Sequence, residues 1–207
     1  MTDLELDPGH MLHVREVRDI IEYLTRGQAM EPSGEGWQLR EGLRDTPMRF
    51  LKAWHDELCA GYDCTEVEIA KMLTQFDHDG YDGLVLLRGI EFTSLCEHHL
   101  LPFTGTAHIA YMPSTKVVGI SKLARVLEVY SRRLQMQENI CTQVTGALEY
   151  HLKPKGSACI LIAKHLCMCA RGVGKQHSSM VTSSMTGIFR DDLNARTELM
   201  RLVEMPQ

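Results

Sequence analysis

Two clusters of metal-binding side chains, far apart in the sequence, most constrain how this chain can fold. The first lies in "SLCEHHLLPF" (94–103), where a thiol, a carboxylate and two imidazoles occupy four consecutive positions, and the second lies in "AKHLCMCARG" (163–172). Cys96 and His99 have the C-x2-H spacing that lets two ligands from one tight turn reach the same ion. A fold that completes this site must bring a thiol of the second cluster to the first.

The number of thiols decides whether such a site is structural or catalytic. If residues 157–170 form one strand, alternation places His165, Cys167 and Cys169 on the same face. One of these thiols would leave a coordination position open, whereas both would close a Cys3His site. Neighbouring positions on one face of a strand lie about 6–7 Å apart, too far for both thiols to reach one tetrahedral ion without a bend. The spacing therefore favours an open, catalytic zinc site.

An open zinc site needs groups that move protons. Zinc lowers the pKa of a bound water to about 7 and so supplies hydroxide at neutral pH. His98 and His165 each neighbour a ligand, and each could transfer protons around the attacked atom. The alternative is that both histidines pack around the ligands. The remaining thiols are interpreted as small packing residues: Cys59, Cys64, Cys141 and Cys159.

The first third of the chain predicts two helices joined by a linker. Residues 12–26 carry an apolar stripe with helical spacing, formed by Leu12, Val17, Ile20, Ile21 and Leu24. The turn-rich stretch "EPSGEGWQ" (31–38) is interpreted as the linker. A second helix is expected to begin with Thr46 as N-cap and Pro47 in the first position, and to end at Gly61.

The rest of the chain favours an α+β fold with a mainly antiparallel sheet. A paired helical segment is expected over 121–152 and a closing helix over 191–204, whereas "DHDGYDG" (77–83) is interpreted as a turn. A calcium loop is disfavoured there because Arg88 occupies the position of the chelating Glu. Strands are expected over 84–95, 105–113, 157–170 and 183–189.

Composition excludes several classes of protein. The 207 residues carry a net charge of −5, which argues against a general nucleic-acid binder. No apolar run is long enough to span a bilayer, and the acidic start "MTDLELDPGH" is unlike a secretory signal. Seven cysteines fit reduced thiols or metal ligands better than a disulfide framework. We therefore expect a cytoplasmic protein with no membrane or nucleic-acid partner.

Three blocks of sequence closely resemble the GTP cyclohydrolase I family: "CEHHLLPFTGTAHIAYMP", "VVGISKLARVLEVYSRRLQMQE" and "HLCMCARGV". The resemblance runs from about residue 42 to 205. It implies an N-terminal helical extension and linker over 1–40 and a catalytic domain over 41–207. It also implies the tunnelling fold (T-fold), whose subunits form a pentameric barrel that stacks into a homodecamer. The family's active sites lie between subunits, so a monomer is expected to be inactive.

The resemblance implies a zinc-dependent hydrolysis of GTP, the first step of tetrahydrofolate and pterin biosynthesis. Its zinc ligands correspond to Cys96, His99 and Cys167, and its catalytic histidines to His98 and His165. Activated water attacks C8 of guanine while a histidine protonates N7. The ring opens and releases formate, and the sugar carbons rearrange to give 7,8-dihydroneopterin triphosphate.

The resemblance also implies contacts with GTP. Glu138 corresponds to the guanine anchor, since a carboxylate can accept from N1–H and the 2-amino group together, and Gln137 is its neighbour in that role. Ser121 is a candidate N-cap, and a helix N-terminus with nearby cations is a ready anion site. The implied triphosphate contacts are Ser121, Lys122, Arg125, Arg171 and, on weaker grounds, Lys52.

Two residues depart from the family's pattern, and two other interpretations stay open. Cys169 stands where many relatives lack a cysteine, and His177 is also outside the expected pattern. A non-catalytic, zinc-stabilised binding module would use a closed Cys3His site that includes Cys169. An enzyme acting on another purine nucleotide is the third interpretation, and the presence of Glu138 counts against it.

Overall fold

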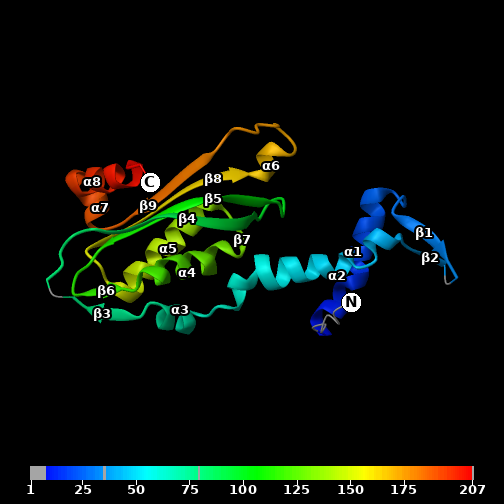
Figure 1. Ribbon diagram of the computed structural model, residues 1–207, viewed down its shortest axis with the longest axis horizontal. Helices are drawn as coiled ribbons and strands as arrows, with labels where there is room; N and C mark the ends of the chain where they lie inside the picture. The colour runs from blue at the N-terminus through cyan, green and yellow to red at the C-terminus, as the bar shows by residue number, and fades with distance from the viewer. Residues whose placement is uncertain (1–7, 35, 79, 207) are drawn as a thin grey trace. The chain divides into compact units, whose positions relative to one another are not determined.

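The computed structural model describes residues 8–34, 36–78 and 80–206 (Figure 1). The chain divides into two compact units, Met1–Cys59 and Ala60–Gln207. The boundary between these units lies later in the sequence than the predicted change from extension to catalytic domain at residue 40. None of the described helices is both long enough and apolar enough to cross a membrane.

The first unit contains a hairpin where the sequence predicted a linker. Strands β1 (Met30–Ser33) and β2 (Gly36–Leu39) pair antiparallel, with Met30 opposite Leu39. The linker prediction is wrong because the turn-forming residues of 31–38 reverse the chain between two short strands. Gly36 adopts a φ of 120°, which other residues rarely tolerate.

The helices of the first unit agree in part with their predictions. Its helical elements are α1 (Pro8–Thr25), η1 (Glu41–Leu43), α2 (Thr46–Leu51) and a π-helical continuation η2 (Lys52–Leu58). Asp45, rather than the predicted Thr46, occupies the N-cap of α2, and Pro47 lies in its first turn.

The apolar stripe of α1 is only partly buried. Val17 is buried, whereas Ile20 and Leu24 are exposed. Of the other predicted stripe residues, Ile21 is half-buried, and the side chain of Leu12 lies outside the described part of the chain. The helix packs against α2.

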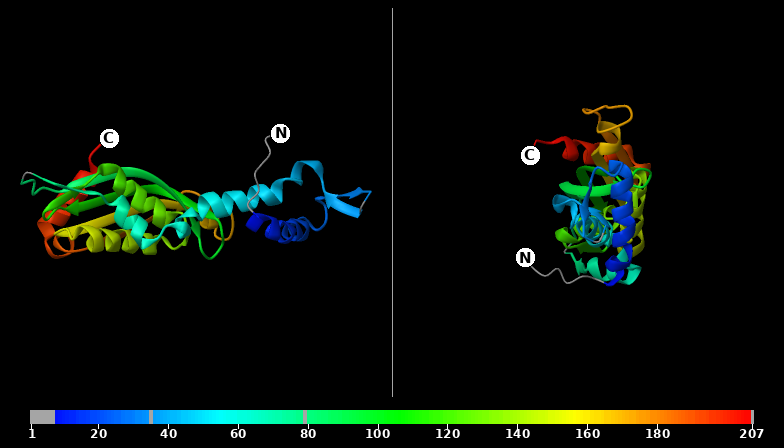
Figure 2. Two further views of the ribbon diagram at one scale, coloured as in Figure 1. Left: turned by 90° about the horizontal axis from the view of Figure 1, so that it is seen from below. Right: turned by 90° about the vertical axis from the view of Figure 1, so that its right-hand side faces the viewer.

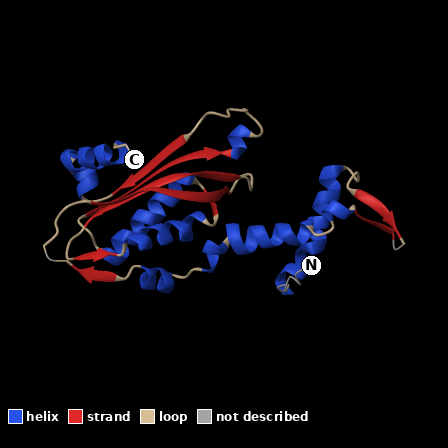
Figure 3. Ribbon diagram, viewed as in Figure 1, coloured by secondary structure: helices blue, strands red, loops and turns tan. Residues whose placement is uncertain are grey.

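The second unit is an α+β domain built on a five-stranded sheet (Figure 3). The sheet has the order β7-β4-β5-β8-β9, and all of its pairs are antiparallel except β4 with β7. Its strands are β4 (Val85–Cys96), β5 (Pro102–Met112), β7 (Leu134–Gln135), β8 (Gly156–His165) and β9 (Met180–Met185). A separate pair joins β3 (Gln75–Asp77) to β6 (Lys116–Val118). The helices are η3 (Ala60–Asp63), α3 (Glu66–Met72), α4 (Ile120–Ser131), α5 (Gln137–Leu152), α6 (Leu166–Cys169), α7 (Ile188–Asp191) and α8 (Leu193–Glu204).

Several predicted boundaries in this unit are wrong. The strand expected over 157–170 ends at His165, where the short helix α6 begins. The strand expected over 183–189 runs instead from Met180 to Met185. The predicted paired helical segment 121–152 is confirmed as α4 and α5, although the short strand β7 between them was not predicted. In the predicted turn 77–83, Asp77 ends β3, described residues 78 and 80–83 form no helix or strand, and residue 79 lies outside the described part.

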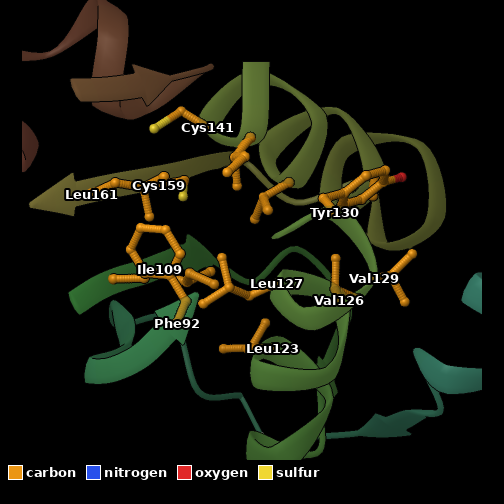
Figure 4. Close-up of a cluster of buried hydrophobic side chains, with 14 of the residues drawn as sticks. Phe92, Ile109, Leu123, Val126, Leu127, Val129, Tyr130, Cys141, Cys159 and Leu161 are labelled. Carbon is orange, nitrogen blue, oxygen red and sulfur yellow. The ribbon is translucent and has the colours of Figure 1, made fainter. Parts of the chain in front are cut away.

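Helices cover both faces of the sheet, and the strand alternation decides which residues each face receives. Helices α4 and α5 lie on one face, and α7 and α8 lie on the other, toward one end of the sheet (Figure 2). In β5 and β8, odd-numbered residues such as Ile109 and Leu161 join the core under α4 and α5 (Figure 4). The even-numbered Ala110 and Ala158 pack against Phe189 of α7.

A bulge in β4 changes which of its residues face α4 and α5. Leu87 pairs with Ile109 and Ile90 with Ala107, so β4 contains one extra residue between these pairs. Gly89 lies in this interval with a φ of 71°. Before the bulge the odd-numbered Leu87 joins the main core, and after it the even-numbered Phe92 and Cys96 do. The bulge therefore places Cys96 on the face covered by α4 and α5.

The buried histidine of β5 gives this fold a predicted pH dependence. Burial, and then the charge of Arg88, lower the pKa of His108 from 6.5. The unfolded chain therefore binds a proton at His108 more readily than the folded chain does. Protonation stabilises the unfolded state, so the free energy of unfolding falls as the pH falls below 6.5. We expect the urea midpoint to fall less between pH 7.5 and 5.5 in His108→Phe than in the wild-type protein. Equal decreases in both proteins would contradict this assignment.

Candidate active site

The turn between β4 and β5 brings Cys96 and His99 together. The backbone N–H groups of His99 and Leu100 both donate to the carbonyl of Cys96, whose own N–H donates to Leu101. Leu100 completes the reversal with a left-handed φ of 54°. As a result, Sγ of Cys96 lies 3.5 Å from Nδ1 of His99.

The third candidate ligand comes from α6, the helical turn that follows β8. Cys96, His99 and Cys167 each present one ligand atom, and these atoms all lie within 4.8 Å of one another. Because Cys167 lies in a helical turn, the strand spacing used to exclude a second thiol does not apply. Instead, the buried Cys169 directs its thiol to the carbonyl of Lys175, at 3.5 Å, and is not part of the three-ligand group.

The geometry and chemistry of this group fit zinc. Tetrahedral zinc with ordinary Zn–S and Zn–N bonds holds a sulfur and a nitrogen about 3.6 Å apart, close to the separation of Cys96 and His99. Two thiolates and an imidazole are ligands that zinc prefers. Without a cation, burial and then the neighbouring Cys96 raise the pKa of the Cys167 thiol. A divalent cation would reverse this effect by favouring the thiolates.

His98 lies in the same turn but outside the three-ligand group. Its side chain is 61% exposed, its Nε2 lies 3.9 Å from a carboxylate oxygen of Glu97, and its Nδ1 lies 3.8 Å from Sγ of Cys96. An exposed imidazole next to a metal ligand can accept or deliver a proton at a bound substrate.

His165 is held more rigidly, at the end of β8. It pairs with Phe103 of β5, and the two rings stack with centroids 4.4 Å apart and planes within 3°. Its Nε2 lies 2.9 Å from Oε1 of Gln137. Burial lowers the pKa of His165, and the carboxylate of Glu138 partly opposes this effect.

These side chains meet at one pocket of about 440 Å³. The three candidate ligands and both candidate catalytic histidines line this pocket. Its other lining residues are Gln135, Met136, Gln137, Glu138, Met168, Ser178, Ser179 and Met180. Of these, only Gln137 and Glu138 were predicted from the sequence. The pairing of β7 beside Cys96 places Gln135, and a two-residue strand has no periodicity that could have revealed it.

The N-terminus of α5 forms one wall of the pocket. The carboxylate of Glu138 is exposed in the first turn of this helix, and no side chain caps the helix N-terminus. Gln137 is 1% exposed, and its side-chain amide is already bonded within the protein. Glu138 is therefore the more accessible of the two predicted guanine contacts.

The predicted triphosphate contacts do not gather at this pocket. Ser121, Lys122 and Arg125 lie in the first turns of α4, and Gly119, not Ser121, occupies its N-cap. The twelve residues of α4 span about 18 Å, and its other end leads to β7 beside Cys96. None of the three residues lines the pocket, and the start of α4 lies beside β6, at the opposite end of the helix from β7 (Figure 1).

The other two predicted cations have different positions. Arg171 follows α6. Its charge lowers the pKa of Cys167, although burial raises that pKa by more. Lys52 is exposed in η2, which belongs to the first unit. His177 is exposed in the loop between α6 and β9.

The family model and the similar proteins found by comparison point to the same family. A family model described as GTP cyclohydrolase I matches residues 27–204. GTP cyclohydrolase 1 of Deinococcus radiodurans is 48% identical over 165 residues, which cover 80% of this chain and 75% of that protein. GTP cyclohydrolase 1 of Wolinella succinogenes is 50% identical over 161 residues, covering 78% and 84% respectively. The corresponding protein of Coxiella burnetii is 48% identical over 164 residues, covering 79% and 88%.

A solved structure gives a weaker match. The crystal structure of the archaeosine synthase QueF-Like in the apo form has a TM-score of 0.43 and 14% identity, and covers 52% of this chain and 96% of that one. A likeness of this size supports no conclusion about the fold. The family model and the three relatives match most of the chain at high identity. The chain therefore belongs to the GTP cyclohydrolase I family of enzymes.

Proposed function

We propose that this protein is a zinc-dependent GTP cyclohydrolase I. It hydrolyses GTP at C8 of guanine, releases formate and forms 7,8-dihydroneopterin triphosphate, the first step of tetrahydrofolate and pterin biosynthesis. The observation that carries this proposal is one pocket that combines a three-ligand metal group with two further histidines and an exposed carboxylate. Membership of the family supports GTP as the substrate.

Cys96, His99 and Cys167 would hold the zinc ion. When bound, zinc supplies a water whose pKa is lowered to about 7, and thus a nucleophile at neutral pH. A group of three candidate ligands is one fewer than structural zinc sites use, and it matches the number of protein ligands in catalytic zinc sites.

The two remaining histidines would move protons. Hydrolysis of a ring C–N bond requires a proton at the departing nitrogen, and positioned acid–base groups typically contribute about 10²–10⁴-fold to such steps. His98 is exposed and can reach a substrate from the rim of the pocket. His165 is fixed by its stacking on Phe103 and can act at one defined place.

Glu138 would select guanine. Its carboxylate would accept from N1–H and from the 2-amino group of guanine, and adenine has neither of these donors. Gln137 lies beside it, and because its side-chain amide is bonded within the protein, a contact with guanine would come from its backbone. Three methionines of the lining, Met136, Met168 and Met180, offer polarisable thioethers to a flat base.

The triphosphate would be bound by residues of more than one subunit. Ser121, Lys122 and Arg125 lie in the first two turns of α4, and none of them lines the pocket of their own chain, which supports an active site shared between subunits. Arg171 and Lys52 would add further positive charge. We propose the T-fold assembly for this purpose, a pentameric barrel stacked into a homodecamer. The cytoplasmic location also stays a prediction.

The first experiment tests the activity itself. Zinc-loaded protein incubated with GTP should release formate and develop pterin absorbance together. His98→Ala should lose at least about 100-fold in turnover while keeping its zinc, because it removes a proton-transfer group without removing a ligand. Full activity of this variant would contradict the role of His98, and neither product from assembled, zinc-loaded wild-type protein would overturn the proposed function.

A second experiment separates the open site from a closed one. In cobalt-substituted protein, the thiolate-to-metal absorption should be unchanged by Cys169→Ser, because this thiol is directed to Lys175. Cys167→Ser should lose about half of that absorption, since it removes one of two thiolate ligands. Loss of absorption in Cys169→Ser would favour the closed Cys3His site of a non-catalytic module.

A third experiment tests sharing between subunits. Arg125→Ala and His165→Ala should each be inactive alone, because one removes a triphosphate contact and the other a catalytic histidine. Mixed oligomers, purified through a different tag on each variant, should recover up to about a quarter of the wild-type rate, as random assembly restores some intact sites. Mixed oligomers without activity would show that both residues act within one subunit's site.

A further inference from the structure

The side-chain amide of Gln137 forms all of its hydrogen bonds within the protein. Gln137 is 1% exposed at the start of α5. Its Nε2 donates to the carbonyl of Leu161 at 3.1 Å and to the carbonyl of Met180 at 3.0 Å. Its Oε1 lies 2.9 Å from Nε2 of His165.

This environment permits only one orientation of the amide. Carbonyl oxygens can accept hydrogen bonds but not donate them, so the two protons of the amide nitrogen must point at Leu161 and Met180. A flipped amide would set its oxygen against two carbonyl oxygens and leave buried acceptors unpaired. The oxygen of Gln137 must therefore face His165.

An amide oxygen facing an imidazole nitrogen dictates where the proton lies. Oε1 of Gln137 only accepts, so Nε2 of His165 must carry a proton. The same requirement holds when the imidazole is neutral and when it is cationic. Among the described residues, none forms a hydrogen bond with Nδ1 of His165, although the ring lines the pocket.

Strand register and stacking hold the ring so that this contact persists. His165 pairs with Phe103 across β5 and β8, and both side chains lie on the sheet face that α5 covers. The stack at 4.4 Å fixes the ring plane, and the hydrogen bond to Gln137 fixes its rotation within that plane. Phe103 itself is fully buried, so it has little freedom to move.

We propose that Gln137 is a positioning residue that keeps a proton on Nε2 of His165, so that His165 gives and takes its catalytic proton only at Nδ1. This inference rests on the proposed function for the catalytic role of His165. It assigns the side chain of Gln137 to the histidine rather than to guanine. A histidine able to adopt either tautomer would spend part of its time with Nδ1 protonated and unable to accept.

The assignment of the proton can be tested without substrate. Nitrogen NMR of zinc-loaded protein labelled with ¹⁵N-histidine, recorded at pH 8 on sedimented protein, distinguishes protonated, bare and metal-bound ring nitrogens. The signals of His165 are assigned by difference from His165→Asn. We expect a protonated Nε2 and a bare Nδ1. A protonated Nδ1 with a bare Nε2, or a metal-bound nitrogen, would overturn the proposal whether or not the protein turns over GTP.

Kinetic variants test the consequence. Gln137→Met keeps the approximate length of the side chain but loses the acceptor, and should lower kcat for GTP about tenfold or more with little change in KM or zinc content. Gln137→Glu still offers a side-chain oxygen as an acceptor to Nε2, and should recover a large part of kcat. A Gln137→Met enzyme with wild-type kcat, or a Gln137→Glu enzyme no better than Gln137→Met, would contradict the positioning role.

A matched control lies on the same helix. Gln143 accepts from Gln135 and has no bond to His165. Gln143→Met should therefore leave the nitrogen signals of His165 and kcat within about twofold of the wild-type protein. An equal loss in Gln143→Met would attribute the effect to disturbance of α5. If Gln137→Met fails to fold, the nitrogen spectrum of the wild-type protein alone still decides the proposal.

Discussion

The antiparallel register of β5 against its two neighbours is the constraint on which the rest of the second unit depends. It decides that one set of alternating side chains enters the core under α4 and α5. The same alternation carries Phe103 and His165 onto that face at one end of the sheet, beside the N-terminus of α5. The polar residues of the site thus continue the face of the sheet that carries the core, and apolar packing holds their side chains in place.

The residues that act locally could be predicted from the sequence. Cys96 and His99 are linked by one turn, so their spacing already allows a shared ion, and the predicted closing helix is found as α8, with Asp192 as its N-cap. The α+β class follows from apolar periodicity, and the sheet is mostly antiparallel as expected. These features depend on interactions within a few residues of the chain, which is the range over which patterns carry information.

The features that depend on distant partners could not be predicted. Alternation places Cys167 and Cys169 on one face only if the strand continues past His165. The helical turn of α6 instead directs the thiol of Cys169 toward Lys175, so Cys169 stays outside the three-ligand group for a different reason. Gln135 reaches the pocket through a two-residue strand, and the bonds of Gln137 join three separate segments of the chain. Such contacts are set by tertiary packing, and a single sequence gives no sign of them.

The bulge near Gly89 has a consequence for how this sequence can change over generations. One extra residue in β4 shifts the phase of everything that follows it as far as Cys96. Deleting the extra residue alone would make the strand regular and leave Cys96 on the same face. A deletion between the bulge and Cys96 would instead send Cys96 to the opposite face of the sheet, although every residue of the "CEHHLLPF" motif would remain intact. Either an insertion or the loss of the bulge would restore the phase. A deletion in this strand should therefore be inherited together with one of these two changes, whereas the exposed loop after α6 has no strand alternation to keep.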